Sequence, residues 1–162
     1  MIKSIELDAF DLKILAALQT DGRLGNQELA DRVHLSASQC SRRRIRLEEA
    51  GIVRGYRADL DPAALGLNVV VFTRVTLSAH SGDNARRFVE LIKGLDCVLE
   101  AFSMTGDSDY LLKLIVPDLK ELSAVVNGSL LPHGSVASVR SSVVLDTLKD
   151  GAPLPLGGVR QG

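Results

Sequence analysis

From residue 67 onward the chain alternates between segments suited to strands and segments suited to helices. The β-branched segment LNVVVFTRVTLS (67–78) is followed by DNARRFVELIKGL (83–95), whose apolar residues recur at helical spacing. Two strand-like segments follow, CVLEAFSM (97–104) and YLLKLIV (110–116), and then a helical segment (118–133) and a last strand (136–148). The order β-α-β-β-α-β predicts a ferredoxin-like sandwich, in which both helices lie on one face of the sheet.

The predicted first strand is apolar on both of its faces. Val71 and Val75 alternate with Val70 and Phe72 along it. The helices of such a sandwich cover only one face of the sheet, so the other face needs a different cover. We expect it to pack against the sheet of a second copy, which predicts a homodimer.

The first 50 residues predict three short helices. Apolar spacing indicates the first, with Asp8 as its cap, and NQELADRV (26–33) forms the second, with Asn26 as its cap. A third helix runs from a cap at Ser36 to about Glu49. Two short helices joined by about three residues, the second one basic, predict a helix-turn-helix. The segment IVRGYRADLD (52–61) is expected to form a two-stranded wing.

Positive charge is concentrated in one part of a nearly neutral chain. The formal net charge is −1, yet residues 32–57 hold seven arginines against two glutamates, a local excess of five. A solvated basic face, paired by glutamates at helical spacing, is the alternative explanation. The helix-turn-helix pattern favours double-stranded DNA as the partner, with the third helix in the major groove. The predicted DNA contacts are Ser36, Ser38, Gln39, Ser41, Arg42, Arg43 and Arg46.

Other classes of protein find little support. No apolar run reaches the roughly 20 residues that a membrane helix needs, and the N-terminus lacks a signal-peptide pattern. Cys40 and Cys97 form no C-x-x-C pair, which is typical of reduced thiols in a cytoplasmic protein. Metal-ligand spacings, phosphate-binding loops and nucleophile elbows are absent from the sequence. We therefore predict a cytoplasmic protein that is not an enzyme and needs no metal or cofactor.

The turn MTGDSDYLL (104–112) joins the two middle strands and permits two interpretations. Gly106 allows a ligand to approach the backbone, and the Asp109 carboxylate suits an α-ammonium group. An ordinary hairpin selects the same residue types, and chemistry alone favours that interpretation.

The order of these motifs resembles the Lrp/AsnC family of transcription regulators. The resemblance covers about residues 7–149, through DLKILAALQTDGRLGNQELADRVHLSASQC, RLEEAGIVRGYRADLDPAALG, GDSDYLLKLIVPDL and VRSSVVLDTLK. It implies an α+β protein: a winged helix-turn-helix (1–60), a hinge strand (61–67) and a ferredoxin-like effector domain of the RAM type (68–149). The Gly/Pro-rich remainder (150–162) is expected to be a flexible tail.

The resemblance also implies a partner and an assembly. Family members form dimers that assemble into octamers, and an amino-acid effector binds between RAM domains. Carried over to this sequence, the effector contacts are Ser103, Met104, Thr105, Gly106, Asp109, Tyr110, Arg140, Ser141 and Ser142.

The chain departs from the family pattern in two places. Arg44 stands where an aliphatic residue is common and Ile45 where a basic one is, and PHGSV (132–136) replaces a Leu-Pro-Gly turn. Because Arg44 follows Cys40 by four residues, we expect it near the core side of the helix.

Two alternative functions remain. Sirohaem decarboxylases are similar to this family in both domains, and an oligomerising effector partner would bind no DNA. The run of serine, glutamine and arginine on the third helix favours a sequence-specific DNA-binding regulator instead.

Overall fold

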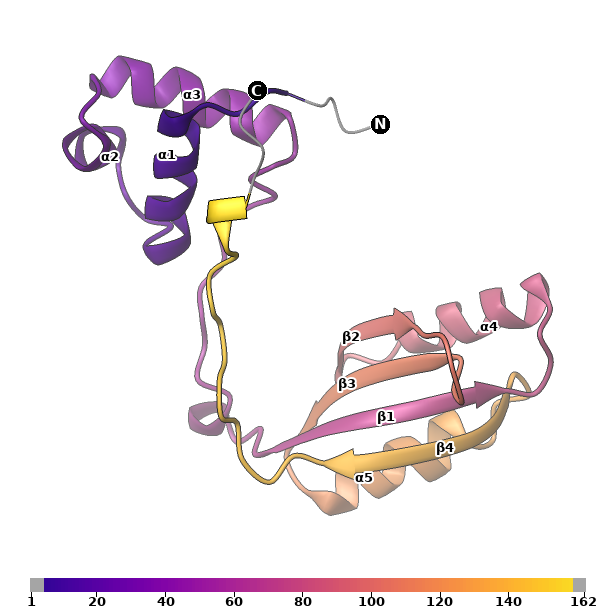
Figure 1. The fold of residues 1–162 in the computed structure, drawn as a ribbon. Helices are drawn as coiled ribbons and strands as arrows, with labels where there is room; N and C mark the ends of the chain where they lie inside the picture. The colour runs from indigo at the N-terminus through magenta and orange to yellow at the C-terminus, as the bar shows by residue number, and fades with distance from the viewer. Residues whose placement is uncertain (1–4, 159–162) are drawn as a thin grey trace. The chain divides into compact units, whose positions relative to one another are not determined.

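The computed structural model describes residues 5–158, which fall into two compact units (Figure 1). The first, here called the helical unit, holds the chain up to Asp59 together with the segment from Lys149 onward. The second, the sheet unit, comprises Leu60–Leu148.

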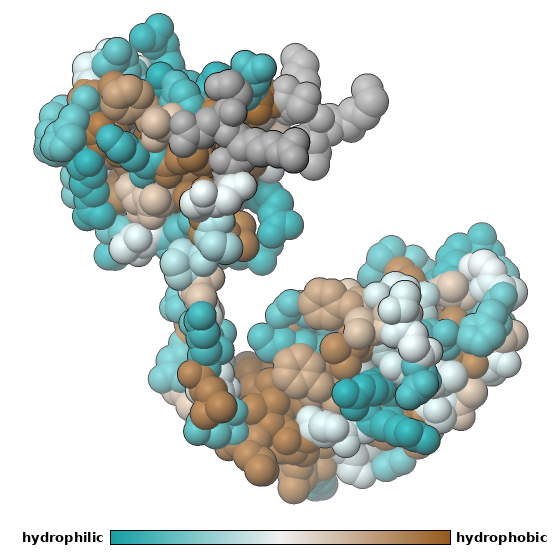
Figure 2. Space-filling view, viewed as in Figure 1, coloured by the Kyte–Doolittle hydropathy of each residue, from teal (hydrophilic) through white to brown (hydrophobic). Residues whose placement is uncertain are grey.

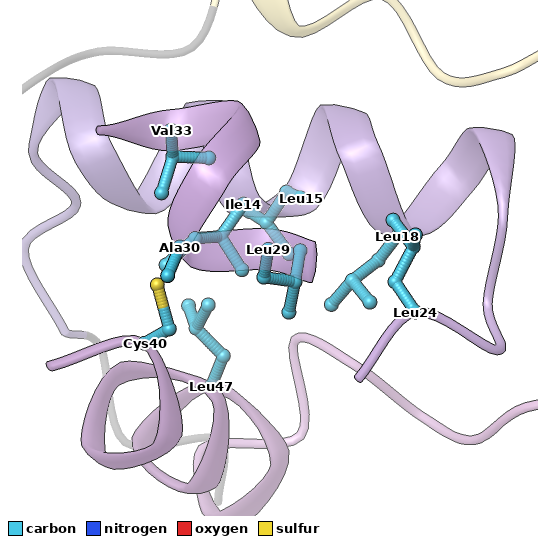
Figure 3. Close-up of a cluster of buried hydrophobic side chains, with 9 residues drawn as sticks. All are labelled: Ile14, Leu15, Leu18, Leu24, Leu29, Ala30, Val33, Cys40 and Leu47. Atoms are coloured by element: carbon cyan, nitrogen blue, oxygen red, sulfur yellow. The ribbon is translucent and has the colours of Figure 1, made fainter. Parts of the chain in front are cut away.

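Three helices build the helical unit: α1 (Ala9–Thr20), α2 (Asn26–Val33) and α3 (Ala37–Glu49). Their apolar faces meet in one core, where the side chains point toward one another (Figure 3). This core consists of Ile14, Leu15, Leu18, Leu24, Leu29, Ala30, Val33, Cys40 and Leu47. Burial raises the pKa of the Cys40 thiol, so this residue packs as a small neutral group. The predicted helix-turn-helix is confirmed.

Short-range hydrogen bonds decide where the helices begin. Asp8 caps α1 in a reciprocal capping box with Asp11, and Ser36 caps α3 as predicted. The cap of α2 is Gly25 rather than the expected Asn26, because the Glu28 side chain accepts a hydrogen bond from the Gly25 backbone N–H at 2.7 Å.

The segment between the two units differs from the prediction. Residues 52–61 form no strand, so the expected wing is not a β-ribbon in this chain. Within the predicted hinge strand, Ala63–Leu65 forms a 3₁₀ turn that Gly66 closes at a φ of 78°. The physical reason is that a strand depends on a hydrogen-bonded neighbour, and this segment pairs with no strand among residues 5–158.

The sheet unit contains four strands and two helices in the predicted order. They are β1 (Val69–Leu77), α4 (Gly82–Lys93), β2 (Val98–Ser103), β3 (Tyr110–Val116), α5 (Leu119–Val125), a π-helical turn (Val126–Leu130) and β4 (Val136–Val143). The strand order is β2-β3-β1-β4 with antiparallel neighbours, and both helices lie behind the sheet in Figure 1. The ferredoxin-like fold is confirmed.

The two faces of this sheet have different surroundings. Val71 and Val75 of β1 are fully buried beneath the helices, and Phe88 of α4 packs against them in the same core. On the opposite face, here called the open face, Phe72 is 38% exposed and Val70 is half-buried. Alternation along β1 therefore divides the strand as predicted.

The C-terminal segment is docked rather than loose in its described part. The Leu154 backbone N–H donates to Gln19 Oε1 at 2.6 Å, and Gln19 Nε2 donates to the Leu154 carbonyl at 3.3 Å. Leu156 packs against the core of the helical unit. The prediction of a flexible tail therefore does not describe residues 154–158; residues 159–162 lie outside the described part of the chain.

Candidate nucleic-acid interface and effector site

The outer face of α3 is polar and basic. Ser38, Gln39 and Arg42 are exposed, and Ser41 is half-buried beside them. Among residues 5–158, no acidic side chain lies within 4.0 Å of the Arg42 guanidinium. Ile45, which the sequence argument did not assign to any contact, is 50% exposed one turn further along.

Arg43 and Arg46 reach back to α1. Arg43 Nη1 donates to Asp8 Oδ2 and to Asp11 Oδ1, both at 2.8 Å, and Arg46 Nη2 donates to Asp11 Oδ2. Asp11 is fully buried, so these two guanidinium groups balance a carboxylate removed from water. The Arg43 guanidinium also lies 5.6 Å from the centroid of the Phe10 ring.

These contacts shift the pKa values of the groups involved. The Asp11 carboxylate, and then that of Asp8, raises the pKa of Arg43 further above its usual range. The backbone N–H of Asp11, followed by Arg43, holds the pKa of Asp8 below its ordinary value. Arg43 and Asp8 are therefore both charged at neutral pH.

Arg44 lies on the core side of α3, as its spacing from Cys40 predicts. Its Nε donates to Glu48 at 3.1 Å, its Nη1 donates to the Leu24 carbonyl at 2.8 Å, and the guanidinium lies 4.6 Å from the Tyr56 ring centroid. The departure from the family pattern is thus accommodated by contacts within the helical unit.

The start of α3 is organised by two of the predicted contact residues. Gln39 Oε1 accepts a hydrogen bond from the Ser36 backbone N–H at 3.0 Å, and Ser36 Oγ accepts one from the Gln39 N–H at 3.2 Å. This capping box holds the first turn of α3 in place.

The sheet unit contains a small pocket at one end of the sheet. The pocket has a volume of about 240 Å³ and is lined by Leu77, His80, Ser81, Gly82, Ala85, Ser103, Met104, Asp109 and Tyr110. Asp109 Oδ2 accepts a hydrogen bond from the Leu77 backbone N–H at 2.7 Å, and Asp109 Oδ1 lies 3.4 Å from His80 Nδ1. A larger cavity of about 670 Å³ in the helical unit, beside Leu154 and Leu156, contains none of the predicted site residues.

The structure brings together some of the predicted effector residues and separates others. Four of the nine line the pocket: Ser103, Met104, Asp109 and Tyr110. Thr105 and Gly106 lie in the adjoining turn, where Gly106 has a φ of 113° that favours glycine.

Arg140, Ser141 and Ser142 lie elsewhere within one chain. They belong to β4, which β1 separates from β3 in the sheet. Arg140 is paired across the sheet with Arg74, and Ser141 Oγ lies 2.9 Å from Thr73 Oγ1. No sequence pattern indicated that Leu77, His80, Ser81, Gly82 and Ala85 form a wall of the pocket, although the cap at Ser81 marks where this segment turns into a helix.

Neither a metal centre nor a membrane span is found in the described part of the chain. Within residues 5–158, no three His, Cys, Asp or Glu side chains are grouped closely enough to hold a metal ion. No helix in that range has the length and apolar character needed to cross a bilayer.

Two domain families match successive parts of the chain. Residues 7–48 match the AsnC-type helix-turn-helix domain, and residues 70–154 match the Lrp/AsnC ligand-binding domain.

Similar proteins match nearly the whole chain. The leucine-responsive regulatory protein of Rhizobium meliloti is 41% identical over 150 residues, which cover 93% of this chain and 96% of that protein. The Bkd operon transcriptional regulator of Pseudomonas aeruginosa is also 41% identical, with coverage of 92% and 99%. A transcriptional regulator of Neisseria meningitidis, solved in complex with L-methionine, has a TM-score of 0.90 at 42% identity and coverage of 93% and 97%.

These relatives are named as regulators, so the decarboxylase alternative receives no support. With a helix-turn-helix domain followed by a ligand-binding domain of matching type, the chain belongs to the Lrp/AsnC family of DNA-binding transcriptional regulators.

Proposed function

We propose that α3 is the recognition helix and that its exposed face enters the major groove of DNA. The observation that carries this proposal is the outer face of α3, where Ser38, Gln39 and Arg42 are exposed on the second helix of a helix-turn-helix. Serine and glutamine reach base edges or phosphates, and arginine binds phosphates or guanine. In a dimer, two such helices enter successive major grooves about one helical turn apart.

The remaining predicted contacts take different roles in this proposal. Ser36 caps α3 close to the phosphate backbone, where exposed helix N–H groups favour an anion. Arg46 is 46% exposed in its side chain and reaches both Asp11 and the groove edge. Arg43, which two carboxylates hold, positions α3 rather than contacting DNA directly.

Arg42→Ala tests the interface without disturbing the fold. Because Arg42 is exposed, we expect unchanged stability, weaker binding to every duplex and a slope of log K against log salt that falls by about 0.9 per subunit. Fluorescence anisotropy from low to physiological salt measures both quantities. Arg86→Ala, at an exposed arginine of the sheet unit, is the matched control and should leave DNA binding unchanged. If the two variants keep the same salt slope, Arg42 contacts no phosphate.

The pocket of the sheet unit is the proposed effector site. An amino acid offers an ammonium group to Asp109, while the first turn of α4 at Gly82 offers backbone N–H groups to its carboxylate. Leu77, Ala85 and Met104 line the same cavity and suit an aliphatic or thioether side chain. The L-methionine complex of the Neisseria meningitidis regulator supports this class of ligand. If effector affinity differs between assembly states, binding shifts the output of the regulator.

Asp109→Asn tests the pocket by removing one charge and almost no volume. The amide oxygen can still accept from the Leu77 N–H, so we expect intact folding and an affinity for the amino acid about 10- to 100-fold weaker. Isothermal titration with the twenty amino acids gives the wild-type ligand and its Kd. Asp107→Asn, at an exposed residue of the same turn, is the control. Equal affinity in both variants would rule out an ammonium contact at Asp109.

The open face of the sheet is the proposed dimer interface. Phe72 and Phe102 are 38% and 45% exposed on it, and half-buried Val70 adjoins Phe72. In Figure 2, hydrophobic atoms gather over the end of the sheet where β1 begins and β4 ends. A second copy would remove this apolar surface from water. We propose further that these dimers assemble into octamers in the cytoplasm. In such an assembly, another subunit would bring β4 residues such as Arg140 toward the effector site.

A further inference from the structure

One wall of the pocket is a connecting segment that is held on two sides. Residues 77–82 link the end of β1 to the start of α4. On the pocket side, the Leu77 N–H donates to Asp109 Oδ2 at 2.7 Å and His80 Nδ1 lies 3.4 Å from Asp109 Oδ1. A ligand ammonium at Asp109 meets the same carboxylate, so this wall must keep its place for the pocket to keep its shape.

The other side of the wall is tied to the turn that precedes β4. The Ser78 backbone N–H donates to the Ser135 carbonyl at 2.9 Å, and Ser78 Oγ donates to the Gly134 carbonyl at 2.8 Å. Ser135 is fully buried. These bonds continue the β1–β4 pairing past the irregularity between Thr76 and Leu77.

Asn84 lies at the centre of these bonds and is only 2% exposed. Its Nδ2 donates to the Ala79 carbonyl at 2.9 Å and to the Ser135 carbonyl at 3.2 Å. Its Oδ1 accepts from Arg87 Nη2 at 2.9 Å, and its backbone N–H donates to Ser81 Oγ at 3.2 Å. Both the nitrogen and the oxygen of this buried amide are hydrogen-bonded, which holds the neighbouring segments in place. Breaking any of these bonds would leave a polar group unpaired away from water.

Asn84 does not line the pocket, although Gly82 and Ala85 on the same helix do. It contacts the wall from behind, through Ala79 and Ser81, and joins that wall to Ser135. A ligand that binds a preformed wall loses less affinity to ordering than one that must order the wall itself.

We propose that Asn84 is the positioning residue of the effector pocket, holding residues 77–82 against the start of β4. The inference rests on the proposed effector site and deepens it. The role requires an amide NH₂ group that donates two hydrogen bonds, to the Ala79 and Ser135 carbonyls. Neither an aspartate nor an alanine side chain supplies such a group.

Asn84→Asp tests this role because it keeps the shape and places acceptors opposite two carbonyls. We expect the Kd for L-methionine or L-leucine, whichever binds the wild type, to rise about tenfold. This is the size of effect expected from losing two neutral hydrogen bonds. Titration calorimetry separates the outcomes. A purely structural role lowers the stoichiometry through loss of folded protein and leaves Kd unchanged, whereas a positioning role raises Kd at full stoichiometry.

A milder variant and a matched control complete the test. Ser78→Ala removes the hydroxyl that donates to the Gly134 carbonyl and accepts from Asn84 Nδ2 at 3.4 Å, and we expect it to fold and to weaken binding by about threefold. Asn127→Ala removes an exposed asparagine that donates to Ser123 Oγ, and its Kd should equal that of the wild type.

The result also distinguishes this inference from the proposed function. Loss of binding in Asp109→Asn together with wild-type Kd in Asn84→Asp and Ser78→Ala overturns the positioning role and leaves the pocket standing. Wild-type Kd in Asp109→Asn, or no binding of either amino acid to the wild type, overturns the pocket and the positioning role together.

Discussion

Arg43→Ala is expected to lower the free energy of unfolding of the helical unit by about 3 kcal/mol, because it breaks a buried ion pair. Asp11 is fully buried and would keep only Arg46 as a partner, while Asp8 would lose its guanidinium contact. Urea unfolding, with hydrogen exchange of the α1 amides to locate the change, measures the effect.

The pH of that measurement follows from the pKa of Asp8. Since this pKa is lowered in the folded chain, the contribution of Asp8 is present above its unfolded value of about 3.9 and is lost as the pH falls through the folded value. Neutral pH therefore lies in the range where the Asp8–Arg43 ion pair is intact, and the part of the Arg43→Ala effect that comes from this pair should shrink in strong acid.

Two further variants show what Arg43 does. Arg42→Ala, next to it on the exposed face, should change stability by less than about 0.5 kcal/mol. Adding Asp11→Asn to Arg43→Ala should recover part of the loss, since the buried charge is then removed. If Arg43→Ala instead weakens DNA binding with no change in unfolding, its guanidinium contacts DNA and the positioning role is wrong.

Phe72→Glu is expected to convert the proposed dimer to a monomer. The change replaces an apolar ring of the open face with a carboxylate, and removing that charge from water against a second copy costs several kcal/mol. In the proposed dimer two recognition helices act together on one operator, so its loss should also weaken binding to a palindromic duplex by more than tenfold. Sedimentation velocity at micromolar concentration and DNA anisotropy measure the two effects.

The control makes the same change on the other side of the sheet unit. Leu119 of α5 is 61% exposed, so Leu119→Glu should leave both the assembly and DNA binding unchanged. A wild-type protein that sediments as a monomer, or a dimer that persists in Phe72→Glu, would show that the open face is not the interface.

Features that depend on neighbouring residues were predictable from the chain. Asp8 and Ser36 cap helices because each bonds to a residue three positions later, and the two faces of β1 follow from the alternation of Val71 with Phe72. The order of strands and helices implied the sandwich and, with it, the turn that carries Asp109. These predictions rest on spacing of a few residues.

Other features were not predictable because they join distant parts of the chain. Arg43 meets Asp8 across 35 residues, Gln19 meets Leu154 across 135, and Asn84 meets Ser135 across 51. Spacing along a helix placed Arg43 on the outer face of α3. The packing of α3 on α1 instead brings its guanidinium to the buried carboxylate of Asp11.

The sequence by itself determined the order of elements, the caps of α1 and α3 and the apolar faces, since these arise from local hydrogen bonding and periodicity. Only the tertiary structure decided which arginines of α3 are paired with α1 and which wall closes the pocket. The reason is that such contacts depend on how whole elements pack, and packing depends on many side chains at once.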